Sequence, residues 1–431
     1  MIIAGRLLLW DGDAYADPSC ARVEPGALRI EDGRIAELGR LADLRAAHPD
    51  APVEDHGDHL VCPGFVDAHC HYPQTAIVAS WGKRLIDWLN GYTFPEEARF
   101  GDRAYANEIA SRHLDLVLAN GTTTVCTFCT SHPGSVDAIF EAAAERGMRI
   151  AAGKTCMDRN VPDDLTDTPQ RAYDESKALA DRWHGAGRAT YAITPRFSPT
   201  STPEQLQALG ALWVERSDCL MQTHISEQTD EVAWVRDLYS DARDYLDTYE
   251  RVGLLGERGL YGHAIWLEPR ERARLAEVGA SVVHCPTSNT FIGSGVFDLA
   301  RTRADGIGVG LATDTGGGSS FSMLRTMAAA YEIGQLAGTA LHPAQLLWLA
   351  TESSAKAMHM ADRIGRIAPG MEADLTVLDL HATPAIAQRA ARAENTWEEI
   401  FPTIMMGDDR AVAAVYVDGT RVGLPTIPAP E

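Results

Sequence analysis

The stretch Pro63-Gly-Phe-Val-Asp-Ala-His-Cys-His71 decides the fold, because it is an apolar strand that ends in polar side chains. Further strand-like runs follow through the middle of the chain, and helical patterns separate them. Residues 106–117, for example, place apolar side chains at helical spacing before Gly121. The expected strands are 65–69, 123–128, 149–154, 190–194, 220–224, 260–263, 281–284 and 308–314. Strands that are each followed by a helix predict an α/β fold, a (β/α)₈ TIM barrel.

Both ends of the chain show short alternating runs that are typical of antiparallel strands. The run 27–36 turns at Asp32-Gly33 and the run 411–422 turns at Asp418-Gly419, and both dipeptides are strong hairpin signals. Residues 373–379 add a further strand. We therefore expect a small β-sandwich domain formed from both termini, residues 1–62 and 371–431. It would flank a catalytic barrel of residues 63–370.

The charge balance excludes several classes of partner. The chain has 38 Lys and Arg against 60 Asp and Glu, which gives a formal net charge of −22. A surface this acidic repels phosphate backbones and anionic lipids, so we expect no nucleic-acid partner and no membrane partner. No run of residues approaches the roughly 20 apolar residues that a membrane-spanning helix needs.

The 8 cysteines are scattered along the chain. A chain of this length does not need disulfide bonds for stability, so we expect reduced thiols and a cytoplasmic location. Cys126-Thr-Phe-Cys129 is a single CxxC pair on a predicted strand, where the two side chains would point to opposite faces. That geometry is poor for zinc, and a structural zinc site usually takes two such pairs.

Residues that can bind a metal stand at the C-terminal ends of predicted strands, where barrel active sites are built. His69 and His71 have i, i+2 spacing, which puts both imidazoles on one face of their strand. His224 and Asp314, at the ends of the fifth and eighth strands, would close around the same ion. Three imidazoles and a carboxylate suit Zn²⁺, or equally Fe²⁺, and leave a position for water. Such an ion lowers the pKa of its water towards about 7.

Further residues at these strand ends suit acid–base chemistry. Glu227, three residues beyond His224, is placed to move protons without binding the metal. Asp314 can take the proton of the bound water, and His263 can orient that water. Taken singly, His263 could be an ordinary buried polar group and Asp314 a helix cap. The coincidence of four strands that deliver such residues at one end of a barrel favours a metal site.

The same residues resemble the amidohydrolase superfamily, from the stretch 63–71 to a closing segment at 369–379, and the resemblance covers essentially the whole chain. More narrowly, four segments resemble the guanine deaminase family: 87–95, 194–197, 223–231 and 284–289. The resemblance implies a metal-dependent aminohydrolase of purine catabolism. It implies that a metal-activated water attacks C2 of guanine, which yields xanthine and ammonia.

The resemblance also implies roles for individual residues. The ligands of one Zn²⁺ per subunit would be His69, His71, His224 and Asp314. The catalytic residues would be Glu227, which protonates the ring nitrogen next to C2, with His263 and Asp314. The residues that contact the substrate would be Gln74, Arg196, Phe197, Glu227, His263 and Asp314. The guanidinium of Arg196 would meet the O6 carbonyl, with Phe197 beside the ring. A homodimer is implied in the same way.

Several alternatives remain open at this point. Lys154, near the end of the third strand, could bridge two metal ions as in two-metal members of the superfamily, although Thr194-Pro-Arg196 at the end of the fourth strand favours a single metal. Trp81 and Trp88 could wall the pocket or pack elsewhere. His284 could stand behind the site or pack in the core.

Three other functions compete with the deamination of guanine. A deaminase of another purine, a pterin or a triazine would share the metal site and differ around Gln74, Arg196 and Phe197. A purine-binding protein without catalysis would not need Glu227. A hydrolase of cyclic amides is disfavoured by the single-metal pattern.

Overall fold

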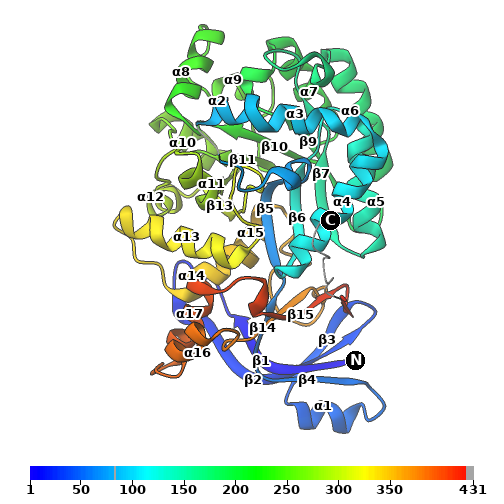
Figure 1. The fold of residues 1–431 in the computed structure, drawn as a ribbon, viewed down its shortest axis with the longest axis vertical. Coiled ribbons are helices and arrows are strands. Elements are labelled where there is room, and N and C mark those ends of the chain that lie inside the picture. Colours follow the sequence, from blue (N-terminus) through cyan, green and yellow to red (C-terminus); the bar gives the residue numbers. More distant parts are fainter. Residues whose placement is uncertain (82–83, 424–431) are drawn as a thin grey trace.

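The computed structural model describes residues 1–81 and 84–423, and within them eight parallel strands form a barrel (Figure 1). The predicted α/β barrel is therefore confirmed. Its strands are β5 (Phe65–His71), β6 (Thr122–Phe128), β7 (Arg149–Gly153), β9 (Ala189–Pro195), β10 (Leu220–Ile225), β11 (Gly259–His263), β12 (Ser281–His284) and β13 (Gly308–Leu311). The short strand β8 (Thr155–Cys156) pairs with the end of β9.

The barrel closes between its last strand and its first, near their C-terminal ends. The strand β13 ends at Leu311, before the expected limit at residue 314. Beyond it, the backbone N–H of Asp314 donates to the carbonyl of His69 at 2.9 Å, and the N–H of His71 donates to the carbonyl of Thr315 at 2.7 Å. These bonds place Asp314 directly beside the two histidines of β5.

Helices cover the outside of the barrel and follow the strands in turn (Figure 1). The longer ones are α4 (Arg103–Ala119), α5 (Pro133–Glu145), α6 (Pro169–Trp183), α7 (Pro203–Glu215), α8 (Thr229–Leu238), α10 (Pro269–Glu277) and α13 (Met323–Leu336). The shorter ones are α2 (Leu85–Trp88), α3 (Phe94–Ala98), α9 (Asp247–Glu250), α11 (Pro286–Phe291), α12 (Leu299–Ala304), α14 (Pro343–Trp348) and α15 (Ser354–Ala357).

The strands near both termini form one seven-stranded mixed sheet within the described residues, drawn below the barrel in Figure 1. Its order is β16 (Thr420–Arg421), β15 (Val412–Val417), β14 (Leu375–Leu378), β4 (Val53–Pro63), β1 (Ile2–Trp10), β2 (Ala21–Glu31) and β3 (Arg34–Gly39). Both predicted hairpins are present. Their turn residues Asp32, Gly33, Asp418 and Gly419 all have positive φ angles, as a two-residue type I′ turn requires. The helix α1 (Leu41–Ala47) follows β3.

Buried ion pairs attach this terminal sheet to the barrel. Arg149 starts β7, and its Nη2 lies 2.6 Å from Oε1 of Glu372, which precedes β14. Arg188, just before β9, lies 2.6 Å from the other oxygen of the same carboxylate. Both arginines are at the N-terminal ends of barrel strands. The sheet therefore leaves the C-terminal ends of the strands, where the candidate residues lie, uncovered.

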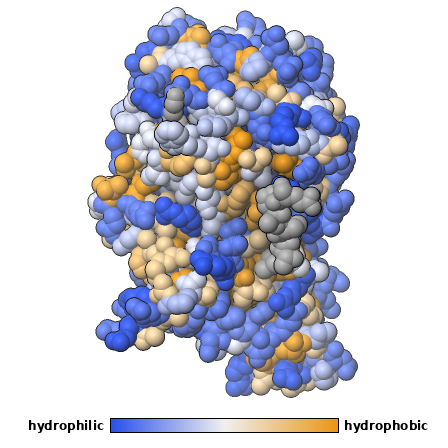
Figure 2. All heavy atoms as spheres, in the orientation of Figure 1, coloured by the Kyte–Doolittle hydropathy of each residue, from blue (hydrophilic) through white to orange (hydrophobic). Residues whose placement is uncertain are grey.

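Of the last two helices, the final one packs on the barrel helix α13 and the other packs against it. They are α16 (Pro384–Ala390) and α17 (Thr396–Met406), and the ring centroids of Phe401 on α17 and Tyr331 on α13 are 5.0 Å apart. On the face drawn in Figure 2, polar residues predominate and apolar residues form separate small groups. Among the helices that the structure describes, none combines the length and the apolar composition needed to cross a membrane.

Candidate active site

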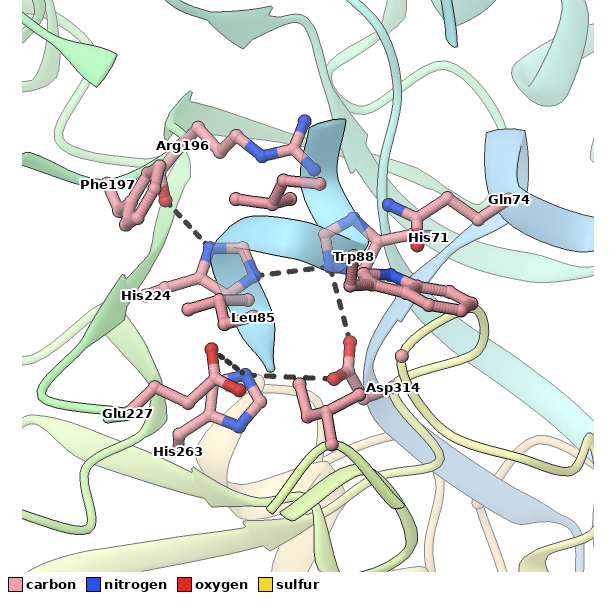
Figure 3. Close-up of a pocket in the computed structure, with 13 residues that line it drawn as sticks. His71, Gln74, Leu85, Trp88, Arg196, Phe197, His224, Glu227, His263 and Asp314 are labelled. Atoms are coloured by element: carbon pink, nitrogen blue, oxygen red, sulfur yellow. Dashed lines mark hydrogen bonds and ion pairs between the residues drawn. The ribbon is translucent and has the colours of Figure 1, made fainter. Parts of the chain in front are cut away.

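The C-terminal ends of the barrel strands open into a pocket (Figure 3). Its polar lining residues are His71, Gln74, Arg196, His224, Glu227, His263 and Asp314. Its apolar lining residues are Leu85, Trp88, Leu89, Phe197 and Ile292. The segment that carries α2 thus forms one wall of the pocket, and the strand ends form the opposite wall.

Four histidines and one aspartate gather around a single point at the base of this pocket. The ligand atoms of His69, His224, His263 and Asp314 all lie within 4.8 Å of one another. The Nε2 of His71 joins them, 3.2 Å from Nε2 of His224 and 3.3 Å from Oδ1 of Asp314. All five side chains are buried, so they form a cluster that can hold a metal ion.

The protonation states of the cluster fit a metal ion. The Nδ1 of His224 lies 2.7 Å from the carbonyl oxygen of Arg196, so Nδ1 carries the proton and Nε2 offers its lone pair to the cluster. Burial lowers the pKa of His71 to about 4, which keeps this imidazole neutral. Among the described residues, Nε2 of His69 has no hydrogen-bond partner. Neutral imidazoles that aim lone pairs at one point are the form that binds metals.

The two carboxylate oxygens of Asp314 contact different neighbours. Its Oδ1 lies 3.4 Å from Nε2 of His69 and 3.3 Å from Nε2 of His71. Its Oδ2 instead lies 3.7 Å from Nε2 of His263. Burial alone would raise the pKa of Asp314, but the adjacent imidazoles of His69 and His71 hold it well below its ordinary value. One oxygen therefore faces the histidines of β5, and the other faces His263 and the pocket.

Glu227 stands next to His263 on the pocket side. Its Oε2 lies 3.6 Å from Nε2 of His263, and its Oε1 accepts a hydrogen bond of 2.8 Å from the hydroxyl of Ser294. Burial, and then repulsion by Asp314, raise the pKa of Glu227 to about 8. The backbone N–H of Glu227 donates to the buried carboxylate of Glu231 at 2.7 Å, which fixes the start of α8.

The backbone is strained at the ends of three of these strands. Ser226, His263 and Asp314 are not glycines, yet their φ angles are 50°, 66° and 47°. Such left-handed residues cost about 1–3 kcal/mol each and cluster at functional sites. The Nδ1 of His263 lies 2.9 Å from the amide oxygen of Asn289, which fixes the ring with Nε2 towards the pocket.

The upper part of the pocket holds the residues expected to contact a substrate. Arg196 follows β9 and Gln74 follows β5, and Figure 3 shows both on the side opposite Glu227. Both side chains bond to Glu97 of α3: Nη1 of Arg196 donates at 2.7 Å and Nε2 of Gln74 donates at 3.0 Å. Phe197 is buried beside the pocket, its ring centroid 6.3 Å from that of His224.

Other residues singled out in the sequence lie elsewhere. The ammonium group of Lys154 is fully buried in ion pairs with Asp167 and with Glu175, which lies at 3.3 Å, so it points away from the cluster. Trp88 lines the pocket, whereas Trp81 is 90% exposed. His284 stacks on Phe297, with 4.6 Å between the ring centroids. In the described residues every cysteine is free.

Sequence reasoning missed several residues that shape this site. Asn289 lies within the segment 284–289 that carried the resemblance, so its contact with His263 could have been suspected. Glu97 lies two residues beyond the segment 87–95, and Ser294 lies outside every recognised segment. Glu97 and Ser294 have no sequence signal that distinguishes them from surface residues.

Comparison with protein families and known proteins agrees with this geometry. A model described as "Amidohydrolase family" matches residues 60–422. A second, described as "Imidazolonepropionase-like composite domain, bacteria", matches residues 26–51 in the terminal sheet. The first covers the barrel together with most of the C-terminal part of the chain.

Named relatives match over nearly the whole length of the chain. The chain is 43% identical to "Guanine deaminase" of Escherichia coli (strain K12), over 93% of this chain and 91% of the relative. It is 43% identical to "Probable guanine deaminase" of Deinococcus radiodurans, over 97% of each. The solved structure of E. coli guanine deaminase superposes with a TM-score of 0.95 at 41% identity, covering 98% of this chain and 99% of that chain.

A solved structure of guanine deaminase from C. acetobutylicum, described as having guanine bound in the active site, gives a TM-score of 0.89 at 27% identity. It covers 98% of this chain and 99% of that chain. The sequence and structural matches therefore extend across the barrel and the terminal sheet alike. This chain belongs to the amidohydrolase family, and within that family it is similar to the guanine deaminases.

Proposed function

We propose that this chain catalyses the hydrolytic deamination of guanine to xanthine and ammonia, a step of purine catabolism. The observation that carries the proposal is one pocket that combines a buried histidine–aspartate cluster, an acid–base carboxylate and a paired guanidinium and amide. The similarity to guanine deaminases over more than nine-tenths of the chain supports the choice of substrate.

We propose one Zn²⁺ per subunit, with Fe²⁺ as the alternative, held by His69, His71, His224 and Asp314. Nε2 of His71 lies close to both Nε2 of His224 and Oδ1 of Asp314, on the same side of that carboxylate as His69, whereas His263 lies on the Oδ2 side. That division favours His71 over His263 as the third imidazole ligand. When bound, such an ion lowers the pKa of a water molecule and supplies a nucleophile near neutral pH.

The remaining polar residues handle protons around the reacting carbon. Asp314 Oδ2 and His263 Nε2 form a site for the attacking water, where Asp314 takes its proton and His263 orients it. Glu227 delivers a proton to the ring nitrogen next to C2. Its position 3.6 Å from His263 supports this role, and the Ser294 hydroxyl donates to its carboxyl group.

The upper part of the pocket binds the purine. The guanidinium of Arg196 donates to the O6 carbonyl, Gln74 contacts the ring edge, and Phe197 lies beside the ring. Apolar side chains from the α2 segment, Leu85 and Trp88, complete the walls. A neutral, flat and polar base is best held by a few directed hydrogen bonds within apolar surroundings, and this lining provides both.

We also propose the setting in which the site works. Residues 63–370 would form the catalytic barrel domain, and residues 1–62 with 371–431 the small supporting domain, with α17 packed back on the barrel. Free cysteines throughout the described chain support a cytoplasmic location. The resemblance to the family supports a homodimer.

The experiment that tests this function is a panel of substrates. Steady-state ammonia release from guanine is compared with release from another aminopurine, a pterin and a triazine, at equal concentrations of metal-loaded protein. The proposal predicts the highest kcat/KM for guanine. Faster turnover of any other ring would replace guanine as the substrate and keep the deaminase chemistry. Purine binding without release of ammonia from any ring would favour a binding protein.

A further inference from the structure

Glu97 is a buried carboxylate that the proposed reaction does not yet use. It lies in the short helix α3 with 0% of its surface exposed. Its two oxygens serve two different residues of the pocket: Oε1 accepts from Nε2 of Gln74 at 3.0 Å, and Oε2 accepts from Nη1 of Arg196 at 2.7 Å. One carboxylate thus holds both Gln74 and Arg196, the two polar side chains proposed to contact the bound base.

The contact with Glu97 fixes which end of the Gln74 amide faces the ligand. An ionised carboxylate can only accept hydrogen bonds, so the amide must turn its Nε2 towards Glu97. The Oε1 of Gln74 then lies beside Gly316, where an added Cβ would come within 2.2 Å of it. Gln74 lines the pocket, so its Oε1 can serve the ligand as an acceptor, while one of its two N–H groups is held by Glu97.

Next to this acceptor, Arg196 offers hydrogen-bond donors. A guanidinium has five N–H donors, and among the described residues only Nη1 donates to an oxygen, that of Glu97. The rest of the group remains available to a ligand. A donor and an acceptor held next to each other match a ring carbonyl beside a ring N–H, which is the O6 and N1–H edge of guanine. A 6-aminopurine presents the reverse pattern on this edge.

We propose that Glu97 is a positioning residue that sets the polarity of Gln74, so that the pocket selects a ring carbonyl beside an N–H. This inference rests on the proposed function. It also explains why a charged side chain is buried in this position, because a neutral amide would turn its nitrogen towards Gln74 and reverse the orientation of that side chain.

The variant Glu97→Gln keeps the shape of the side chain at position 97 but should reverse which end of the Gln74 amide faces the ligand. Arg196 cannot accept a hydrogen bond, so the amide introduced at position 97 must turn its oxygen to Arg196 and its nitrogen to Gln74. Gln74 must then flip, and its Nε2 would face N1–H of guanine, donor against donor. The same flipped amide would suit the unprotonated N1 of 2,6-diaminopurine, which keeps the amino group at C2.

The test is the ratio of kcat/KM for guanine to kcat/KM for 2,6-diaminopurine, measured on one preparation of metal-loaded enzyme. The ratio does not depend on the fraction of correctly folded protein. We expect it to fall by about tenfold or more in Glu97→Gln, the effect of one mismatched buried hydrogen bond. If neither base is turned over measurably, the same ratio is taken from their dissociation constants by calorimetry.

A second variant tests polarity against mere packing. The double variant Gln74→Glu with Glu97→Gln exchanges the carboxylate and the amide. Residue 74 can then only accept hydrogen bonds, so it again suits N1–H of guanine. We expect the double variant to restore most of the ratio of guanine to 2,6-diaminopurine kcat/KM that Glu97→Gln loses. The control is Glu96→Gln in the same helix, because Glu96 is also buried but accepts from Arg99, at 3.0 Å, and from Tyr105. We expect Glu96→Gln to leave the ratio unchanged.

The outcomes separate this inference from the proposed function. If Glu97→Gln changes the ratio by less than about twofold, or the exchange of carboxylate and amide fails to restore it, Glu97 does not set the polarity of Gln74. If the unmodified enzyme does not release ammonia from guanine, the proposed function fails before any variant is compared.

Discussion

A substitution at Gly262 should displace the predicted metal ligand His69 without replacing that histidine. This glycine lies in β11, next to the imidazole of His69. A Cβ added at residue 262 would stand 2.8 Å from Cε1 and 3.1 Å from Nδ1 of that ring. Its φ angle is not in the left-handed region, so the backbone tolerates alanine and the ring is the main obstacle.

The size of the effect follows from these distances. Non-bonded carbon atoms settle about 3.5–4.0 Å apart, so the His69 ring must retreat by roughly 0.7–1.2 Å in Gly262→Ala. Metal–ligand distances tolerate only about 0.2 Å of error. We therefore expect the affinity for the metal to fall by roughly 10–100-fold. Overpacking of the barrel should cost about 1–3 kcal/mol of stability.

The assay is a competition of the purified protein against a coloured chelator, with thermal unfolding measured on the same samples. Gly39→Ala is the matched control, because Gly39 ends a strand of the terminal sheet and an added Cβ there meets Leu44 at an ordinary 3.8 Å. We expect Gly39→Ala to bind metal as the unmodified protein does. Unchanged affinity in Gly262→Ala would refute the assignment of His69 as a ligand held at this point.

Two further predictions concern acid–base groups. Glu227→Gln should slow ammonia release by about 10²–10⁴-fold while the metal content stays the same, and full activity with bound metal would contradict its role as proton carrier. Glu372→Gln should destabilise the protein near pH 7 by up to about 3–5 kcal/mol, because it breaks the buried pairs with Arg149 and Arg188. Burial opposes ionisation of Glu372, yet these arginines hold its pKa below the ordinary 4.5, so the stabilisation is complete above pH 4.5 and is lost as the pH falls through the lowered value. The difference in free energy of unfolding between the variant and the unmodified protein, measured with urea, should therefore narrow in acid. An equal difference at pH 7 and pH 4 would exclude the charge of Glu372 as its cause.

Much of the barrel could be predicted because each strand carries its own signal. An apolar run with polar residues at its end predicts both the strand and the side of the barrel that carries the chemistry. The prediction failed locally at β13, which ends at Leu311, because the chain turns before Asp314 and that residue adopts a φ angle of 47°. Periodicity cannot reveal such a turn, since it depends on contacts with His69 on the neighbouring strand.

The residues that support the site could not be predicted for a related reason. Glu97 lies in a helix of five residues, too short to show a hydrophobic period. Its partners are 23 and 99 positions away in the chain, so nothing local marks it as buried. Likewise, the packing of α17 on α13 depends on a contact between Phe401 and Tyr331 that no local pattern contains.

The most direct test of the central claim is ammonia release from guanine by protein whose metal content is measured in the same sample. We expect one equivalent of metal per chain and equal amounts of xanthine and ammonia. A chelator should abolish this activity, and added metal should restore it in proportion to the metal bound. Metal-loaded protein that releases no ammonia from guanine, or metal-free protein that releases it at the full rate, would contradict the account.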